Sequence, residues 1–217
     1  GMTVTVLLVD DHPMIRQGLR NLVTSEANFQ VVGEAGDGLE AIQKIEQTRP
    51  DILIIDMMMP NLNGLEVLLH VKKLSPKTRT IVFSMQSAEP YVVEALRAGA
   101  DGYILKETGP GELIAAIHSV LQGNRYLSER LSELLEANGS RVEDAPLDLY
   151  QSLTAREREI LQMAAEGRSS VEIGEKLSIS PRTAEIHRSR CLKKLGLRNQ
   201  AELVRYAIKR GILSLDK

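Results

Sequence analysis

The chain has 217 residues, enough for one large domain or two small ones. Hydrophobic residues make up 43% and charged residues 26%, a balance typical of globular proteins rather than disordered chains. A single cysteine excludes an internal disulfide framework, and no apolar run approaches the ~20 residues of a membrane span. We therefore expect a cytoplasmic protein with no membrane partner.

Charge is distributed unevenly along the chain. The formal net charge is −2, but residues 1–122 hold 10 basic and 15 acidic residues, 123–152 hold 3 and 6, and 153–217 hold 14 and 8. A basic C-terminal third after an acidic body is typical of a nucleic-acid-binding module joined to another domain. A merely lysine-rich surface would give the same totals. The acidic portions could also hold the basic portion electrostatically, and raised salt would then separate them.

Residues 3–122 contain five short apolar runs, each followed by a segment with helical spacing. The runs are Val4–Val9, Val31–Ala35, Ile52–Ile55, Thr80–Phe83 and Gly102–Leu105. Such runs are typical of parallel strands that are buried on both faces. With right-handed crossovers they predict an α/β fold, a doubly wound five-stranded parallel sheet in the order 2-1-3-4-5. Its ligand site is expected beyond the carboxyl ends of the strands.

The stretch 123–152 is expected to link two domains. Ser128–Asn138 could form a short helix, whereas Asn138–Ser140 and the acidic segment Val142–Pro146 are typical of a flexible connection. We therefore predict a first domain over 3–122 and a second over 153–217.

The second domain is predicted to be small, all-α and built from four helices. Helix starts are marked by a capping residue with a glutamate three positions later or a proline next to it: Thr154…Glu157, Ser169…Glu172, Ser180-Pro181 and Asn199…Glu202. Glycines stand where helices should end, at Gly167, Gly196 and Gly211. The tight turn Ser178–Ser180 between the middle two helices predicts a helix-turn-helix.

Polar residues follow the predicted strands at their carboxyl ends. Asp10 and Asp11 follow the first strand, Asp56 the third, Ser84 the fourth and Lys106 the fifth. In the predicted strand order the first and third strands are neighbours, so three carboxylates should lie at one rim. Clustered carboxylates repel one another unless a cation compensates, and oxygen ligands favour a hard divalent ion, Mg²⁺ best of all.

The same rim has the groups that phosphoryl transfer requires. Asp56 could attack phosphorus in line, Lys106 and the metal could absorb charge on the phosphoryl oxygens, and Ser84 could donate to one of them. The expected product is an aspartyl phosphate. Each residue alone could be a helix cap, a turn residue or a surface charge, but their coincidence at the ends of four strands favours a site.

Several motifs of the first domain resemble the receiver domain of two-component response regulators. They are Leu7–Asp11, Asp56–Pro60 followed by Gly64, Ser84, and Tyr103–Lys106. The resemblance covers residues 3–122. It implies a phospho-acceptor that loses its phosphoryl group slowly and is not a turnover enzyme.

The resemblance also implies individual roles at the rim. Asp56 would accept the phosphoryl group from a sensor histidine kinase that docks beside the first helix. Asp11, Asp56 and the main-chain carbonyl of Met58 would ligate Mg²⁺, and Asp10 would assist through water.

Three further positions bear on the switch. Ser84 and Lys106 would contact the phosphoryl group, and Tyr103 would turn inward when Ser84 moves. Tyr103 could instead be an ordinary half-buried tyrosine of the sheet. Glu107 departs from the proline that many receivers carry after the lysine.

The helix after Ser180 has two different faces when projected at 100° per residue. The inner face is small and apolar, with Ala184, His187, Cys191 and Leu195, and the outer face carries Arg182, Glu185, Ile186, Ser189 and Lys193. Arg188, Arg190 and Lys194 lie on the flanks. The pattern fits a helix whose flanks meet phosphates while its outer ridge meets base edges.

Two features of this helix have alternative interpretations. Ile186 could contact a thymine methyl group, a second copy or another domain. His187 and Cys191 could be metal ligands, but without further partners they are better explained as core residues.

Motifs of the second domain resemble the LuxR-type helix-turn-helix, so the whole chain resembles the NarL/FixJ class of response regulators. They are Leu153–Leu161, Ala165–Gly167, Glu172-Ile173, Ser180–Ala184 and Lys194–Gly196. The resemblance implies base contacts from Glu185, Ile186 and Ser189. Phosphate contacts would come from Arg182, Thr183 and the neighbouring basic residues Arg188, Arg190, Lys193 and Lys194.

The implied function is a phosphorylation-switched transcription regulator that binds double-stranded promoter DNA as a homodimer. The last helix, Asn199–Lys209, would supply the dimer contact, with Leu203 and Ala207 as candidates. An aspartate-based phosphatase is disfavoured because the position two residues after Asp56 is Met58 rather than a second aspartate. A LuxR protein that senses a small ligand would not need the metal and lysine constellation.

Overall fold

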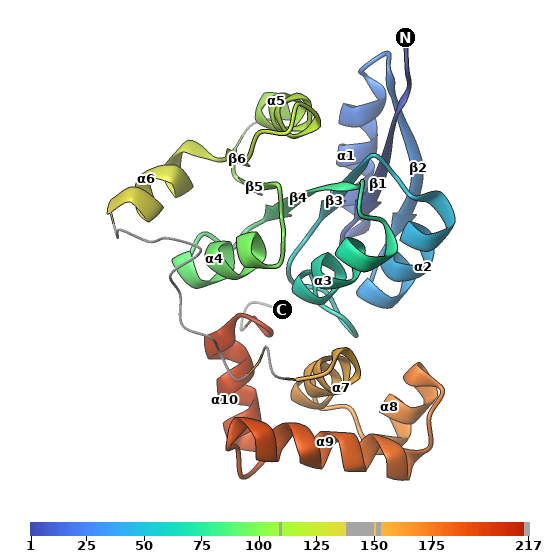
Figure 1. The fold of residues 1–217 in the computed structure, drawn as a ribbon, viewed down its shortest axis with the longest axis vertical. Coiled ribbons are helices and arrows are strands. Elements are labelled where there is room, and N and C mark those ends of the chain that lie inside the picture. The colour runs from blue at the N-terminus through green and yellow to red at the C-terminus, as the bar shows by residue number, and fades with distance from the viewer. Residues whose placement is uncertain (109, 138–149, 151–152, 215–217) are drawn as a thin grey trace. The chain divides into compact units, whose positions relative to one another are not determined.

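The computed structural model describes residues 1–108, 110–137, 150 and 153–214. The chain divides into two compact units, one of residues 1–59 and 63–144 and one of residues 60–62 and 145–217. The first unit has a sheet with helices and the second is helical (Figure 1). Within the described ranges, no helix combines the length and the apolar character needed to cross a membrane.

The first unit is a six-stranded, all-parallel sheet in the order β2-β1-β3-β4-β5-β6. Its elements are β1 (Val4–Val9), α1 (Pro13–Thr24), β2 (Phe29–Ala35), α2 (Gly38–Thr48), β3 (Ile52–Ile55), α3 (Gly64–Leu74), β4 (Arg79–Ser84), α4 (Glu89–Arg97), β5 (Gly102–Leu105), α5 (Pro110–Leu121), β6 (Tyr126–Leu127) and α6 (Glu129–Ala137). The predicted α/β fold and strand order are confirmed. The predicted strand count was one too low, because β6 pairs with β5 at the edge.

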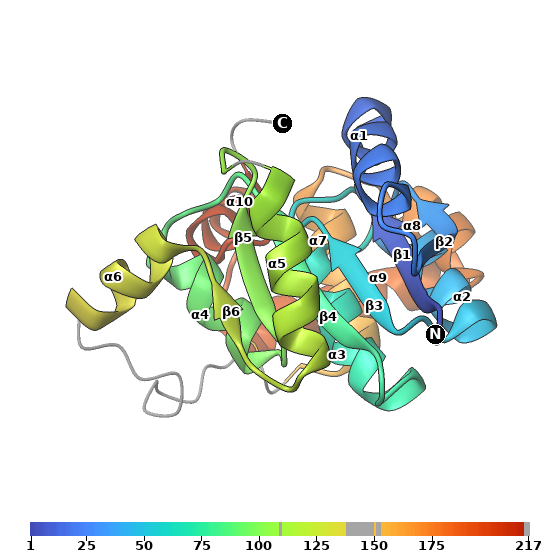
Figure 2. The same cartoon turned by 90° about the horizontal axis from the view of Figure 1, so that it is seen from above.

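Helices cover both faces of the sheet. Figure 2 shows α5 lying across β4 and β5, with α3 and α4 on the far side. On the α1 and α5 side, Leu19 and Ile117 pack on Val6, Ile54 and Ile104 in one core cluster. Every residue of β3 and β5 is buried, which explains why these strands are uniformly apolar.

Part of the stretch predicted as a linker is folded with the first unit. β6 lies there, and α6 is the short helix expected over Ser128–Asn138; α6 packs against α4. The segments Asn138–Ser140 and Val142–Pro146 lie outside the described residues, so the domain boundaries at 122 and 152 stay predictions.

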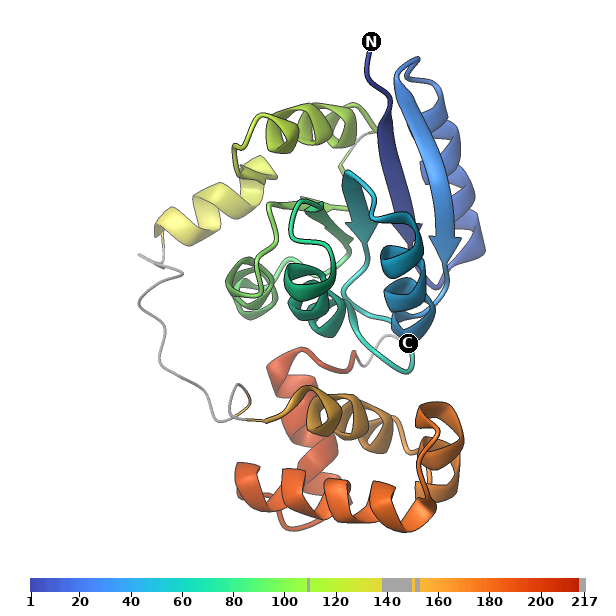
Figure 3. The same ribbon diagram turned by 45° about the vertical axis from the view of Figure 1, so that its right-hand side comes forward.

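The second unit contains the four predicted helices. They are α7 (Ala155–Ala165), α8 (Ser170–Leu177), α9 (Pro181–Leu195) and α10 (Gln200–Arg210). In Figure 3, α8 and the longer α9 are joined by a short turn, which confirms the helix-turn-helix. Gly196 and Gly211 close α9 and α10 in the left-handed conformation, as expected.

The capping boxes differ from one another. At Ser169 both halves are present, since the Ser169 side chain accepts from the Glu172 N–H and the Glu172 side chain accepts from the Ser169 N–H. At Thr154 only the first half forms. The carboxylate of Glu157 instead lies 2.7 Å from Lys194 Nζ, a contact between α7 and α9.

In the helix-turn-helix, the backbone of α8 at Gly174 lies very close to the backbone of the turn at Ile179. A Cβ atom at Gly174 would lie 2.6 Å from the carbonyl oxygen of Ile179. Ser178 ends α8 with φ +56°, in the left-handed region. Glycine at 174 therefore allows α9 to begin directly against α8.

Candidate functional site

The carboxylates predicted at the rim come together because β1 and β3 are neighbours. Val9 pairs with Ile55, and the Asp56 N–H donates to Val9 O at 3.0 Å. Ligand atoms of Asp10, Asp11, His12 and Asp56 all lie within 4.8 Å of one another. We call these four residues the carboxylate rim.

Lys106 from the end of β5 lies across the rim. Its Nζ is 2.6 Å from Asp10 Oδ2 and 3.3 Å from Asp56 Oδ2, and its side chain is only 8% exposed. Burial lowers the pKa of Lys106, but the charge of Asp56 and the hydrogen bonds to Asp10 together outweigh burial and raise it above its usual value. Lys106 is therefore an ammonium group at neutral pH.

The donor set of the rim fits a hard divalent cation. Three carboxylates face the single lysine charge, so the cluster retains an excess of negative charge and of oxygen donors. Asp10 is engaged by protein on both oxygens, since Oδ1 accepts from the His12 N–H at 2.8 Å and Oδ2 from Lys106. Asp11, with 21% of its side chain exposed, is the more accessible carboxylate.

His12 is a member of the rim that sequence reasoning missed. Its Nδ1 lies 3.2 Å from Asp10 Oδ1 and 3.1 Å from Asp11 Oδ1. The available signal was a histidine directly after an Asp-Asp pair at a strand end.

The loop after Asp56 is held tightly. The Met58 N–H lies 3.4 Å from Asp56 Oδ1, and Gly64 donates to Met57 O at 2.9 Å. A Cβ atom at Gly64 would lie 2.4 Å from the main-chain oxygen of Asp56. The start of α3 thus fixes the segment that carries Asp56 and Met58.

Ser84 and Tyr103 hold one further loop between them. Both are completely buried. Ser84 Oγ accepts from the Gln86 N–H at 3.1 Å, and Tyr103 OH donates to Gln86 O at 2.7 Å. Burial raises the pKa of Tyr103 well above its usual value, so the phenol stays protonated. Tyr103 is completely buried rather than half-buried, and its role as a switch residue stays a prediction.

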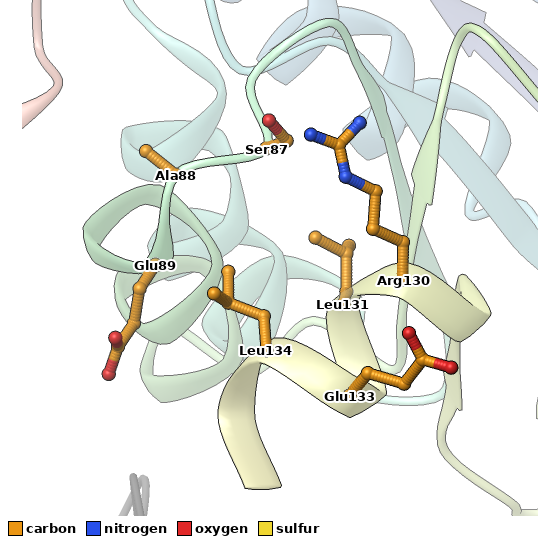
Figure 4. Close-up of a pocket in the computed structure, with 7 residues that line it drawn as sticks. All are labelled: Ser87, Ala88, Glu89, Arg130, Leu131, Glu133 and Leu134. Atoms are coloured by element: carbon orange, nitrogen blue, oxygen red, sulfur yellow. The ribbon is translucent and has the colours of Figure 1, made fainter. Parts of the chain in front are cut away.

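This loop leads into a pocket of about 490 Å³ beside α6 (Figure 4). Ser87, Ala88 and Glu89 line it on one side, and Arg130, Leu131, Glu133 and Leu134 on the other. Arg130 Nη1 also lies 2.8 Å from Glu107 Oε1, so the residue after Lys106 forms an ion pair with α6.

A second, mainly apolar groove of about 290 Å³ lies beside α1. Five residues of α1 and four from other elements line the groove: Met14, Ile15, Gly18, Leu19, Leu22, Phe83, Lys106, Thr108 and Leu113. Met14 is 87% exposed. The groove therefore reaches from exposed apolar surface to Lys106, which lies across the carboxylate rim.

Three of the four residues predicted on the inner face of α9 are buried, and His187 is partly exposed. Ala184, Cys191 and Leu195 are buried. The exposed residues on the outer face and flanks are Arg182, Glu185, Ile186, Ser189, Arg190, Lys193 and Lys194, while Thr183 and Arg188 are partly exposed. Cys191 Sγ donates to Glu157 O, and burial raises the pKa of its thiol to about 12, as suits a core residue.

Several side chains predicted to contact DNA also have partners within the unit. Lys194 pairs with Glu157. Burial raises the pKa of Glu157, but hydrogen bonds from Lys194 and Thr154 outweigh burial, and the pKa lies below its usual value. Arg188 donates to Gln200 at 2.9 Å, and Glu185 accepts from Ser170 Oγ at 2.7 Å.

The two candidate dimer residues require a correction. Leu203 and Ala207 are 0% exposed, and their helix α10 packs against α7. Side chains without exposed surface cannot contact a second copy in this conformation. Leu203 and Ala207 are core residues.

The receiver-type sheet with its carboxylate rim, together with the helix-turn-helix, defines a response regulator that binds DNA. Residues 6–118 match the response regulator receiver domain, and residues 151–207 match the luxR family of bacterial regulatory proteins. The chain belongs to the LuxR-type two-component response regulators, which are transcription regulators and not turnover enzymes.

Relatives align over nearly the whole chain. The nitrate/nitrite response regulator protein NarL of Escherichia coli (strain K12) is 39% identical and covers 91% of this chain and 92% of its own. The oxygen regulatory protein NreC of Staphylococcus epidermidis is 35% identical, and the match covers 96% of this chain and 98% of NreC. The response regulator RcsB, solved in complex with DNA, has a TM-score of 0.60 at 27% identity. The match covers 96% of this chain and 98% of the RcsB chain.

Proposed function

We propose that Asp56 is the phospho-acceptor and that its phosphorylation, by a sensor histidine kinase, controls binding of promoter DNA by α9. The observation that carries this proposal is the Lys106 ammonium between Asp10 and Asp56. Asp11 and His12 lie beside them and offer two further ligand atoms for a metal ion. The receiver spans residues 3–122, the linker 123–152 and the DNA-binding domain 153–217 in this proposal.

The phosphoryl transfer follows from the groups at the rim. An Asp56 oxygen attacks phosphorus in line, the bond to the donor breaks, and the donor leaves with the bonding electrons. Lys106 stabilises charge on the phosphoryl oxygens, and Ser84 donates to one of them after the loop moves. Asp11, Asp56 and the carbonyl of Met58 would hold Mg²⁺, with Asp10 assisting through water; when bound, Mg²⁺ neutralises phosphoryl charge.

The groove beside α1 is the proposed docking surface of the kinase. It combines exposed Met14 with Lys106 at one end, so a helix seated there would bring a phosphohistidine to the rim. Because the chain has no second carboxylate two residues after Asp56 to activate water, we expect slow loss of the phosphoryl group.

Ser84 and Tyr103 are the proposed switch residues. Both bind Gln86, so a Ser84 hydroxyl recruited to the phosphoryl group would release its bond to the Gln86 N–H. The loop borders α4 and the pocket beside α6, and a change there would alter the surface that precedes the linker.

The proposed DNA interface is the exposed face of α9. Glu185, Ile186 and Ser189 contact base edges, and the phosphate contacts come from Arg182, Thr183, Arg188, Arg190, Lys193 and Lys194. RcsB has been solved as dimers bound to DNA, which supports a homodimer on a two-fold operator with half-sites about one helical turn apart. A regulator of this kind acts in the cytoplasm.

The proposal is tested by transfer of radiolabel from a small acyl phosphate in the presence of Mg²⁺. The intact protein should take up label, and Asp56→Ala should take up none. A Glu46→Gln variant, which removes an exposed carboxylate from α2, should be labelled normally. Label retained by Asp56→Ala would contradict the assignment.

A further inference from the structure

The outer face of α9 carries one carboxylate among its cations. Residues 180–198 include six basic residues and a single acidic one, Glu185. Its side chain is 53% exposed. On a helix that faces DNA, phosphates repel a carboxylate, so Glu185 weakens binding unless a base donates to it.

Glu185 is held in position by the neighbouring helix. Ser170 Oγ, on the first residue of α8, donates to Glu185 Oε2 at 2.7 Å. The other oxygen, Oε1, lies 3.9 Å from Arg188 Nη1, beyond hydrogen-bond distance. Arg188 is itself fixed by donating to Gln200. The carboxylate is therefore oriented in advance and keeps acceptor capacity on Oε1.

The chemistry of the major groove restricts what such an acceptor can read. Base donors there are the N4 amino group of cytosine and the N6 amino group of adenine. Adenine also presents its N7 acceptor beside N6, which would repel the carboxylate, whereas cytosine has no acceptor in that position. Guanine and thymine offer only acceptors and a methyl group.

We infer that Glu185 is a specificity-determining residue that accepts from cytosine N4, and that Ser170 is its positioning residue. This inference rests on the proposed DNA interface of α9. It predicts a cytosine at one position of each operator half-site.

The test is selection of bound duplexes from a randomised DNA library by the full-length protein treated with acyl phosphate. At one position per half-site the intact protein should prefer cytosine about tenfold, within the range for one good side-chain–base pair. Glu185→Gln should move that preference to adenine, because an amide can donate to N7 while it accepts from N6.

Two further variants separate readout from structural effects. Ser170→Ala keeps the Ser169 cap and should lower the cytosine preference about threefold, a typical hydrogen-bond contribution, without a change in melting temperature. Glu175→Gln removes an exposed charge from α8 and should leave every base preference unchanged.

The outcomes are distinguishable. If Glu185→Gln and the intact protein select the same bases, the inference is wrong although the DNA interface stands. If Ser170→Ala lowers stability and weakens all sequences equally, the bond only joins two helices and the positioning role is wrong. If the intact protein selects no sequence, the proposed DNA interface itself fails.

Discussion

The carboxylate rim carries mainly negative charge and the exposed face of α9 mainly positive charge, and the two regions hold their charges in different ways. Asp10 of the rim and the adjacent Lys106 are almost completely buried and lie at the ends of strands fixed in a sheet. On α9, Arg182 and Lys193 are exposed on long side chains. A rim of this kind could hold a small ion at fixed geometry, and the charges of α9 match an extended polyanion.

This contrast predicts two kinds of response. Buried charges interact strongly and are screened little, so single substitutions at the rim should have large effects that salt hardly changes. Exposed charges on α9 should contribute small, graded effects that weaken steeply with salt.

The largest effect is expected from Lys106→Ala. Removal of the ammonium takes its positive charge away from buried Asp10 and Asp56 and should lower the free energy of unfolding by about 3 kcal/mol. Millimolar Mg²⁺ should restore part of the loss, because it supplies the missing positive charge. Denaturant titration with and without Mg²⁺ measures both effects. Lys73→Ala removes an exposed lysine, serves as the control and should change stability by less than about 0.5 kcal/mol. Equal losses in the two variants would contradict the claim that the buried charge of Lys106 contributes more to stability than an exposed charge.

Gly64→Ala should have the next largest effect. Its methyl group would meet the main chain of Asp56, so the loop must shift, and we expect a loss of about 2 kcal/mol together with slower phosphorylation. Gly18→Ala, a helical glycine with open space around its Cβ position, should not lower stability. Thermal unfolding and acyl phosphate labelling measure both, and normal labelling of Gly64→Ala would show that the loop does not need this contact.

Arg182→Ala combined with Lys193→Ala should weaken DNA binding for all sequences alike. Each lost phosphate contact lowers the slope of log affinity against log salt by about 0.9, so the slope should fall by about 2. Anisotropy titrations at several salt concentrations measure the slope, with Lys73→Ala as the control. An unchanged slope would remove these two residues from the interface.

The smallest effect concerns pH and the pair between Glu157 and Lys194. The pKa of Glu157 is lowered in the folded state. Ionised Glu157 therefore stabilises the fold above about pH 4.5, and this stabilisation is lost as pH falls through the folded pKa. Glu157→Gln should therefore cost about 1 kcal/mol at pH 7 and less at pH 3.5. Thermal unfolding at both pH values measures the difference, and a loss that stays constant with pH would exclude the ion pair as its source.

Much of the fold could be predicted because the signals are local. Apolar runs identified the strands, and the polar residues directly after them identified the rim, since parallel strands end at one edge. β6 was missed because a strand of two residues, Tyr126–Leu127, is too short to show periodicity.

Long-range contacts were harder to predict. The second half of the capping box at Thr154 is absent because Glu157 instead binds Lys194, which is far along the chain. Leu203 and Ala207 were misassigned because an apolar stripe on a helix looks the same whether it packs in a core or at an interface. The Ser170–Glu185 bond joins two helices and has no sequence signal of its own.

The most direct test of the central claim is the affinity for a selected duplex, measured by anisotropy with Mg²⁺ and with or without acyl phosphate. In the intact protein, acyl phosphate should tighten binding, and in Asp56→Ala the two affinities should be the same. Equal tightening in both proteins, or no tightening in an intact protein shown to be labelled, would contradict control of DNA binding through Asp56.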